Sequence, residues 1–263
     1  MTTLFLAWQD SHSRRWFTVG RLDATSDQYS FSYTNGARSA AQNAGFEPLA
    51  AFPSLEQNYT SDNIFPLFSN RFLPTYRSEY SDYLKWLNIP ASERDPVAIL
   101  ARSGGQRATD TLEVFPKPVR NSAGYFEFHF LVHGLRHMPP ESVERVLHLK
   151  QGEPLLAMKD VQNPKDPRAI ALRTAELKDG DLRIVGYLPR YLCEDYLQIS
   201  ADGQFPSISV ERVNEPPVPV QFRLLCKAVV KASAEIDICA GVDYQPLTAS
   251  TAPRSESAAA SNR

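Results

Sequence analysis

The sequence has little cysteine, no long apolar run and no surplus of either charge. Its 263 residues include three cysteines, whose odd number and wide spacing favour reduced core thiols over disulfides or a zinc knuckle: Cys193, Cys226 and Cys239. No apolar stretch approaches the ~20 residues that a membrane span needs. The basic residues of the opening MTTLFLAWQDSHSRR follow a short apolar run, which is the reverse of a secretory signal. We therefore expect a cytoplasmic protein.

The charges nearly balance, with 28 Lys and Arg against 30 Asp and Glu and a net charge of −2. Proteins that coat long nucleic acids neutralise many phosphates with a surplus of basic residues. This balance argues against that class, and it leaves room for a site that contacts only a few phosphates.

Common catalytic motifs are absent from the sequence. It contains no G-x-S-x-G elbow, no G-x-x-x-x-G-K-[ST] loop and no H-E-x-x-H helix. The Gly104-Gly105 pair follows an expected helix instead of opening one, so it is a poor phosphate cradle. We expect neither an enzyme nor a cofactor, and we assign no catalytic residue.

Three histidines recur every four residues in EFHFLVHGLRH: His129, His133 and His137. On a helix this spacing would stack three imidazoles for a metal ion. The surrounding residues are typical of a strand, where a rise of ~3.3 Å per residue places the outer rings too far apart for one zinc ion. We predict no metal site here.

The first third of the chain predicts a small α+β unit. LFLAWQ, WFTVGRL and QYSFSYT are rich in aromatic and β-branched residues and indicate a meander of three strands. Helices are expected in TSDNIFPLFSNRFL, SEYSDYLKWL and DPVAILARSGG, the last with Asp95 as N-cap, Pro96 at its first position and Gly104 as its stop. TDTLEVFP then returns to a strand.

From Tyr125 the pattern becomes rich in strands, which are expected in YFEFHFLVHGL, PLLAMKD, AIALRT, LRIVGYL, ISVERV and VQFRLLCKAVV. Only two short helices, in PPESVERVLHL and RYLCEDYLQI, interrupt them. Many short strands with little helix indicate a small closed or partly open barrel. The expected fold is therefore α+β: an N-terminal β-meander with helices over residues 1–117, a linker at 118–123, a β-barrel over 124–244, and a disordered tail at 245–263.

The stretch NPKDPRAIAL, residues 163–172, places two prolines and charged residues directly before an apolar run. Each proline biases its preceding residue, Asn163 or Asp166, toward extended backbone, so the stretch predicts entry into a strand. An Asx turn with no further role is one explanation. By charge alone, a solvated face explains the arginines of this unit better than a groove does.

Three stretches, taken in order, resemble the HIRAN domain: H-G-L-R at 133–136, N-P-K-D-P-R-A-I at 163–170 and V-G-Y-L-P-R at 185–190. The resemblance covers roughly residues 124–232. It implies a barrel related to the oligonucleotide-binding fold. In helicase members of that family the domain captures the 3′ end of single-stranded DNA.

Carried over to this sequence, the resemblance implies a nucleic-acid-binding set of Arg136, His137, Asn163, Lys165, Asp166, Tyr187 and Arg190. His137 stands where the family has a tyrosine, and Lys165 where it has an aromatic platform. Base stacking, worth ~1–3 kcal/mol per base, is reduced by these changes, whereas attraction for phosphate is not.

Residues 2–117 resemble the small N-terminal subdomain of HipA-type toxin kinases in the order and character of their segments. No kinase catalytic segment follows. The leading hypothesis is thus a non-catalytic protein whose barrel binds single-stranded DNA 3′ ends and whose first domain docks a protein. The alternative is an antitoxin-like regulator that binds a HipA-type kinase partner.

Overall fold

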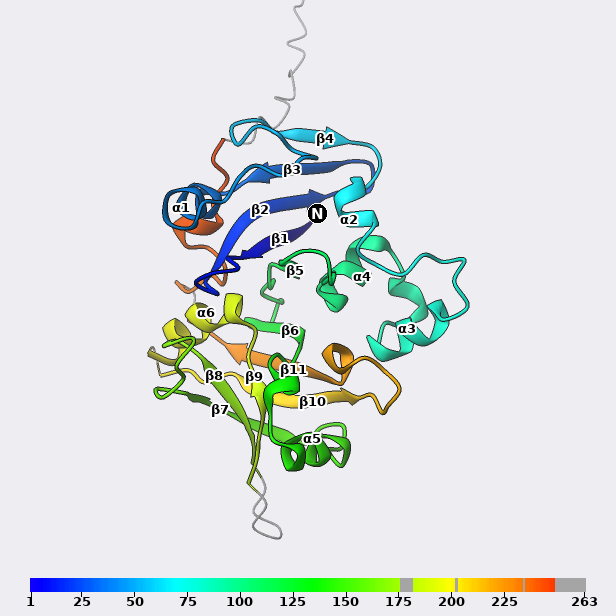
Figure 1. The fold of residues 1–263 in the computed structure, drawn as a ribbon, viewed down its shortest axis with the longest axis vertical. Coiled ribbons are helices and arrows are strands. Elements are labelled where there is room, and N and C mark those ends of the chain that lie inside the picture. Colours follow the sequence, from blue (N-terminus) through cyan, green and yellow to red (C-terminus); the bar gives the residue numbers. More distant parts are fainter. Residues whose placement is uncertain (176–181, 202, 234, 249–263) are drawn as a thin grey trace, which may run out of the picture.

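The computed structural model describes residues 1–175, 182–201, 203–233 and 235–248. These residues form two antiparallel sheets and six α-helices, so the expected α+β mixture is confirmed. Figure 1 shows the five-stranded sheet above the six-stranded sheet, with β5 and β6 facing each other where the two meet. We call residues 1–116 the first half and residues 125–231 the second half.

The first half contains a sheet in the order β4-β3-β2-β1-β5, in which every neighbouring pair is antiparallel. The expected meander is its centre. Its strands are β1 (Thr2–Gln9), β2 (Trp16–Ala24), β3 (Tyr29–Tyr33), β4 (Tyr59–Ser61) and β5 (Leu112–Pro116).

Helices α1 (Asn35–Ala44), α2 (Pro66–Ser69), α3 (Tyr80–Trp86) and α4 (Pro96–Ser103) follow or join these strands. The start and stop of α4 are as predicted: the Asp95 carboxylate accepts from the amides of Val97 and Ala98, and Gly104 ends the helix in the left-handed region. Helix α1 was not expected from the sequence, because its opening Asn35-Gly36 pair is typical of a turn.

The strand β1 is buried on both faces, which explains its unbroken apolar run. Leu4 and Leu6 point into the core of the first half. Phe5 and Ala7 point the other way, into a core that the two halves share. Because side chains alternate along a strand, β1 is one layer of two cores.

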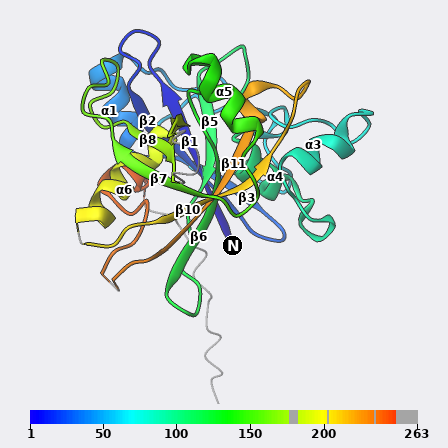
Figure 2. The same ribbon diagram turned by 90° about the horizontal axis from the view of Figure 1, so that it is seen from below.

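The second half contains a sheet in the order β6-β11-β10-β7-β8-β9, again antiparallel throughout. Its strands are β6 (Tyr125–Leu131), β7 (Pro154–Lys159), β8 (Ile170–Thr174), β9 (Ile184–Tyr187), β10 (Ser207–Val213) and β11 (Leu224–Lys231), with helices α5 (Pro140–Leu147) and α6 (Arg190–Ala201). Both predicted helices are therefore present, and Figure 2 shows them on opposite sides of the strands.

This second sheet curls into a half-barrel. Just beyond β6, His133 pairs with Tyr187 at the end of β9, and each of the two amides donates to the other residue's carbonyl at 2.9 Å. The pair connects the two edge strands of the sheet. It is also the point at which two of the stretches singled out in the sequence meet.

The two halves share a buried core, whose members come from β1, β5, β6, α6, β11 and the segment after β11. Phe115 stacks on Tyr191 with ring centroids 4.0 Å apart and planes 10° apart. The shared core means that neither half buries all of its apolar surface alone.

The segment expected to be an exposed linker, 118–123, is bound to the second half. The Arg120 guanidinium donates to the carbonyls of Gly124, Ala232, Ser233 and Ile236 and lies over the Phe126 ring. A single cation thus fixes the segment, which composition alone did not indicate. The domain limits themselves stay a prediction.

The expected tail also begins later than residue 245. The Leu247 amide donates to the Tyr33 carbonyl at 2.8 Å, and the Thr248 hydroxyl to the Asn58 side chain at 2.6 Å. The chain therefore returns from the second half to the first, as the orange to red ribbon beside α1 shows in Figure 1. The remainder of the predicted tail, 249–263, lies outside the described residues.

None of the helices in the described part of the chain is long and apolar enough to cross a bilayer.

Candidate nucleic-acid site

The candidate site is built around the loop that joins β7 to β8, residues 160–169. Its ends are closed by the Asp160 amide, which donates to the Ala169 carbonyl at 2.9 Å. Inside it, the Asn163 side-chain oxygen accepts from the amides of Lys165 and Asp166 at 3.0 and 3.1 Å. One Asp166 oxygen accepts from the Arg168 amide at 2.9 Å. Two successive Asx turns therefore shape the loop, and an Asx turn was one of the explanations of the sequence NPKDPRAIAL.

The second oxygen of Asp166 binds Arg190, at the start of α6, with Nε and Oδ2 2.7 Å apart. Both side chains are about a quarter exposed, at 25% and 26%. The loop is thereby attached to the end of the V-G-Y-L-P-R stretch. Among the described residues, these two contacts use about two of the roughly four acceptor positions of the Asp166 carboxylate.

Tyr187 joins the loop to β9 through Asp160, a residue that the sequence analysis missed. The Tyr187 hydroxyl donates to Asp160 Oδ2 at 2.9 Å, and the Asn163 side-chain Nδ2 donates to the same oxygen at 3.3 Å. Burial, together with the neighbouring Asp160 carboxylate, raises the pKa of Tyr187, so the phenol stays protonated and donates. The position of Asp160 at the end of a predicted strand, three residues before Asn163, was the available signal.

Two glycines allow the H-G-L-R and V-G-Y-L-P-R stretches to approach each other. A Cβ on Gly186 would lie 2.3 Å from Val132 Cγ1 and 2.7 Å from the His133 carbonyl oxygen. A Cβ on Gly134 would lie 3.0 Å from the Tyr187 ring. Both residues have positive φ, at +136° and +74°. The glycines of the H-G-L-R and V-G-Y-L-P-R stretches therefore have a structural role beside any binding role.

Arg136, His137 and Lys165 are exposed. Arg136 and His137 lie in the short 3₁₀ helix Leu135–His137, directly after the His133–Tyr187 pair, and Arg136 Nε donates to His137 Nε2 at 3.0 Å. The structure thus brings Asn163, Asp166, Tyr187 and Arg190 into one bonded network. It leaves Arg136, His137 and the Lys165 side chain on the surface, outside that network.

Acidic groups offset much of the positive charge around the loop. Arg190 binds Asp166, and Arg168 binds Glu194. Arg136 and Lys165 form no ion pair with another described residue. Within the described residues, the arrangement offers two cations without an ion pair and a carboxylate with further acceptor positions, which suits a short anionic ligand that also carries a hydroxyl.

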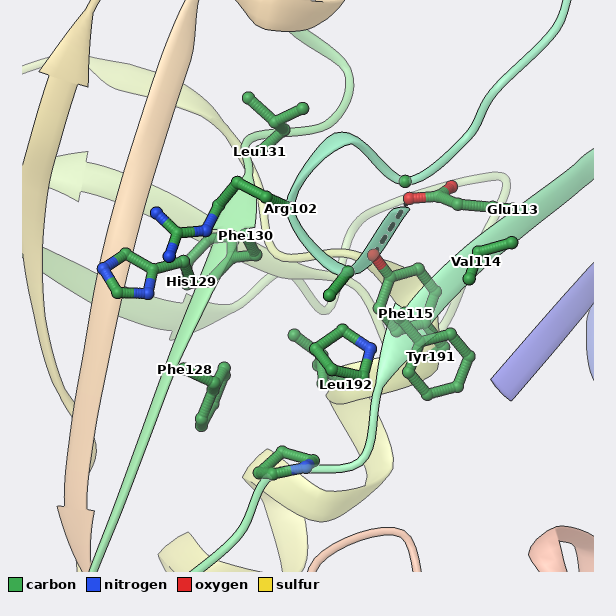
Figure 3. A pocket seen from close by; sticks show the side chains of 14 residues that line it. Arg102, Glu113, Val114, Phe115, Phe128, His129, Phe130, Leu131, Tyr191 and Leu192 are labelled. Atoms are coloured by element: carbon green, nitrogen blue, oxygen red, sulfur yellow. Dashed lines mark hydrogen bonds between the residues drawn. The ribbon is translucent and has the colours of Figure 1, made fainter. Parts of the chain in front are cut away.

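A small cavity lies elsewhere, between the two halves (Figure 3). Its volume of about 20 Å³ is enough for about one water molecule. Arg102 and His129 line one side, and Glu113 and Tyr191 the other. The cavity is too small for a substrate.

The three histidines have separate surroundings. His129 lies 3.9 Å from Glu211, His133 lies 3.0 Å from Glu113, and His137 contacts Arg136. In the described part of the chain, no three His, Cys, Asp or Glu side chains gather as a metal site would require.

Comparison with known proteins yields only partial likenesses. No family model and no curated protein matches the chain. A crystal structure of a protein from Lactobacillus plantarum is similar over 40% of this chain and 98% of its own, with 19% identity and a TM-score of 0.29. The HIRAN domain of human HLTF is similar over 44% of this chain and 85% of its own, with 18% identity and a TM-score of 0.31. Neither likeness identifies a family for the chain.

Proposed function

We propose that this protein binds the 3′ end of a nucleic-acid single strand, preferably DNA, on a HIRAN-like barrel and without catalysing a reaction. The observation that supports this most is the meeting of three stretches far apart in sequence. H-G-L-R and V-G-Y-L-P-R pair through His133 and Tyr187, and the N-P-K-D turn joins the second of them through Asp166 and Arg190.

Each group of the site has a chemical task in this proposal. Arg136 and Lys165 are exposed cations that attract backbone phosphates. Asp166 is a poor neighbour for a phosphate, but its free acceptor positions suit the terminal hydroxyl. Because few cations are available, binding should depend only weakly on salt concentration.

The test compares two otherwise identical short strands, one ending in a 3′-hydroxyl and one in a 3′-phosphate. The phosphate removes the hydroxyl donor and places about two negative charges beside Asp166. A hydrogen bond to a charged group contributes ~1.5–3 kcal/mol, so the wild type should bind the phosphate strand about 10- to 100-fold more weakly. Asp166→Asn keeps an acceptor and loses the charge, so it should discriminate much less. Fluorescence anisotropy measures both affinities.

Two arginine variants test whether strand binding depends on the candidate site. Arg136→Ala should weaken the binding of both strands alike, while Arg94→Ala, which removes an exposed arginine of the first half, should change neither. Equal affinity of the wild type for both strand ends would show that the N-P-K-D turn is only a turn.

For the first half we propose a protein-docking role, from the resemblance of residues 2–117 to the HipA-type subdomain. The alternative function, an antitoxin-like regulator that binds a HipA-type kinase, rests on the same resemblance. Binding to such a kinase, with no affinity for either strand at low salt, would favour it.

A further inference from the structure

A buried carboxylate from the first half reaches into the second half. Glu113 lies on β5, where it alternates with Val114 and shares the direction of Phe115, whose ring belongs to the shared core. The residue is only 3% exposed. A charge in such a place is retained at a cost unless its partners compensate it.

Two side chains of the second half contact one Glu113 oxygen and offset the cost of burying its charge. The Tyr191 hydroxyl donates to Oε1 at 2.9 Å, as the dashed line in Figure 3 shows, and His133 Nε2 lies 3.0 Å from the same atom. The other oxygen, Oε2, is buried and has no partner among the described residues. In the described part of the chain, both side-chain partners of the Glu113 carboxylate therefore come from the opposite half.

The two partners adjoin the candidate site along the chain. His133 pairs by its backbone with Tyr187, and Arg136 follows three residues later. Tyr191 follows Arg190, whose side chain binds Asp166. One carboxylate thus contacts the two segments that carry Arg136, His137 and Arg190.

We infer that Glu113 of the first half is a positioning residue for the candidate nucleic-acid site of the second half, acting through His133 and Tyr191. The consequence for binding rests on the proposed function, whereas the consequence for the shape of the site does not. The first half then has a role that needs no further protein: it completes the platform on which the site lies.

The groups that face His133 come from three elements. Glu113 of β5 and Tyr191 of α6 contact its ring, and Tyr187 of β9 pairs with its backbone while directing its hydroxyl to Asp160. The Cys193 and Cys239 thiols also act electrostatically on Tyr191 and raise its pKa. Burial, the Glu113 charge and the Glu113 hydrogen bond raise the pKa of Tyr191 well above its usual value, so it remains a donor.

The His133–Glu113 contact depends on pH in a defined direction. Burial lowers the pKa of His133, but the charge of Glu113 and its hydrogen bond outweigh burial, so the net shift is upward. A histidine whose pKa is raised on folding contributes stability that is complete at low pH and is lost as the pH rises through the raised value. The junction should therefore loosen above the ordinary histidine pKa of about 6.5.

The test uses the full chain and the conservative variant Glu113→Gln, which keeps an acceptor and removes the charge. Denaturation midpoints are measured between about pH 5.5 and about pH 9, a window around the ordinary histidine pKa. The wild type should lose stability on the alkaline side, and Glu113→Gln should give a flatter profile. His129→Gln is the matched control, because burial lowers the pKa of His129 to about 4 and the ring is neutral over this window.

Hydrogen exchange at the His133 and Tyr187 amides reports the shape of the site without any ligand. Glu113→Gln should speed exchange at both amides on the order of tenfold, and His129→Gln should not. In the same samples, Glu113→Gln should lower the affinity for the 3′-hydroxyl strand on the order of tenfold. An unchanged pH profile together with unchanged exchange in Glu113→Gln would overturn the inference.

The two proposals fail differently. If the wild type binds no strand, the proposed function fails, and faster exchange in Glu113→Gln still supports Glu113 as the residue that fixes these segments. If the strand binds equally well to wild type and Glu113→Gln while exchange is unchanged, the positioning role alone is wrong.

Discussion

The candidate loop and the junction between the halves use similar groups in opposite surroundings. In the loop, Asp166 and Arg190 are each about a quarter exposed. In the junction, Glu113 is almost wholly buried and one of its oxygens is unpartnered. Water can replace either partner in the loop, so those contacts can be exchanged for a ligand at small cost. The junction has room for only about one water molecule, so its contacts set shape instead of binding.

The largest effect should come from the glycine that brings the two regions together. Gly186→Ala places a Cβ 2.3 Å from Val132 and 2.7 Å from the His133 carbonyl oxygen at a positive φ. We expect the free energy of unfolding to fall by about 3 kcal/mol, because backbone and side chain must both move. Denaturant titration measures it.

Gly152→Ala is the control for backbone strain alone. Gly152 also has a positive φ, +83°, but nothing lies within 4 Å of its added Cβ. This variant should lose only about 1 kcal/mol. Similar losses in both variants would show that the close approach of His133 to Tyr187 is unimportant.

An intermediate effect should come from Arg120, which attaches the segment between the halves. Arg120→Ala removes bonds to four carbonyl oxygens and should lower the free energy of unfolding by about 2 kcal/mol. Limited proteolysis should then cut the variant near residues 117–120 much faster than the wild type.

Lys117→Ala tests whether loss of a nearby charge is sufficient. Lys117 pairs with Asp237, whose side chain is 55% exposed, so this variant should lose at most about 1 kcal/mol. If Lys117→Ala became as sensitive to protease as Arg120→Ala, the segment would be a simple exposed linker, as the sequence analysis expected.

The sequence predicted elements better than it predicted connections between them. Alternation and turn residues located ten of the strands and both helices of the second half, because those patterns are local. The strand around Tyr59 was missed, since three residues give too little alternation. Glu113 appeared only as one charge in a strand, and Asp160 only as the last residue of another. The His133 partner of Glu113 and the Tyr187 partner of Asp160 lie 20 and 27 residues away, so no local pattern could reveal these two contacts.

In the candidate site, too, the local turn was predictable from the sequence and the contact between distant segments was not. The Asx turn of Asn163 follows from residue type and two prolines, and it is present. The Asp166–Arg190 pair needs the register of β8 and β9 and the start of α6, none of which a sequence pattern fixes. The three stretches could be grouped beforehand only through a family resemblance.

The smallest effect should come from the Arg168–Glu194 pair beside the candidate loop. Its side chains are 54% and 56% exposed, about twice the exposure of Asp166 and Arg190. Exposed pairs contribute little because water screens them and both side chains lose freedom. A double-mutant cycle on Arg168→Ala and Glu194→Ala should give a coupling energy of about 0.5 kcal/mol or less. The same cycle on Asp166→Ala and Arg190→Ala should give somewhat more, up to about 1 kcal/mol. If the outer pair proved the stronger, exposure would not be what separates the contacts of this surface, and the loop would be a more rigid structure than an exchangeable binding site requires.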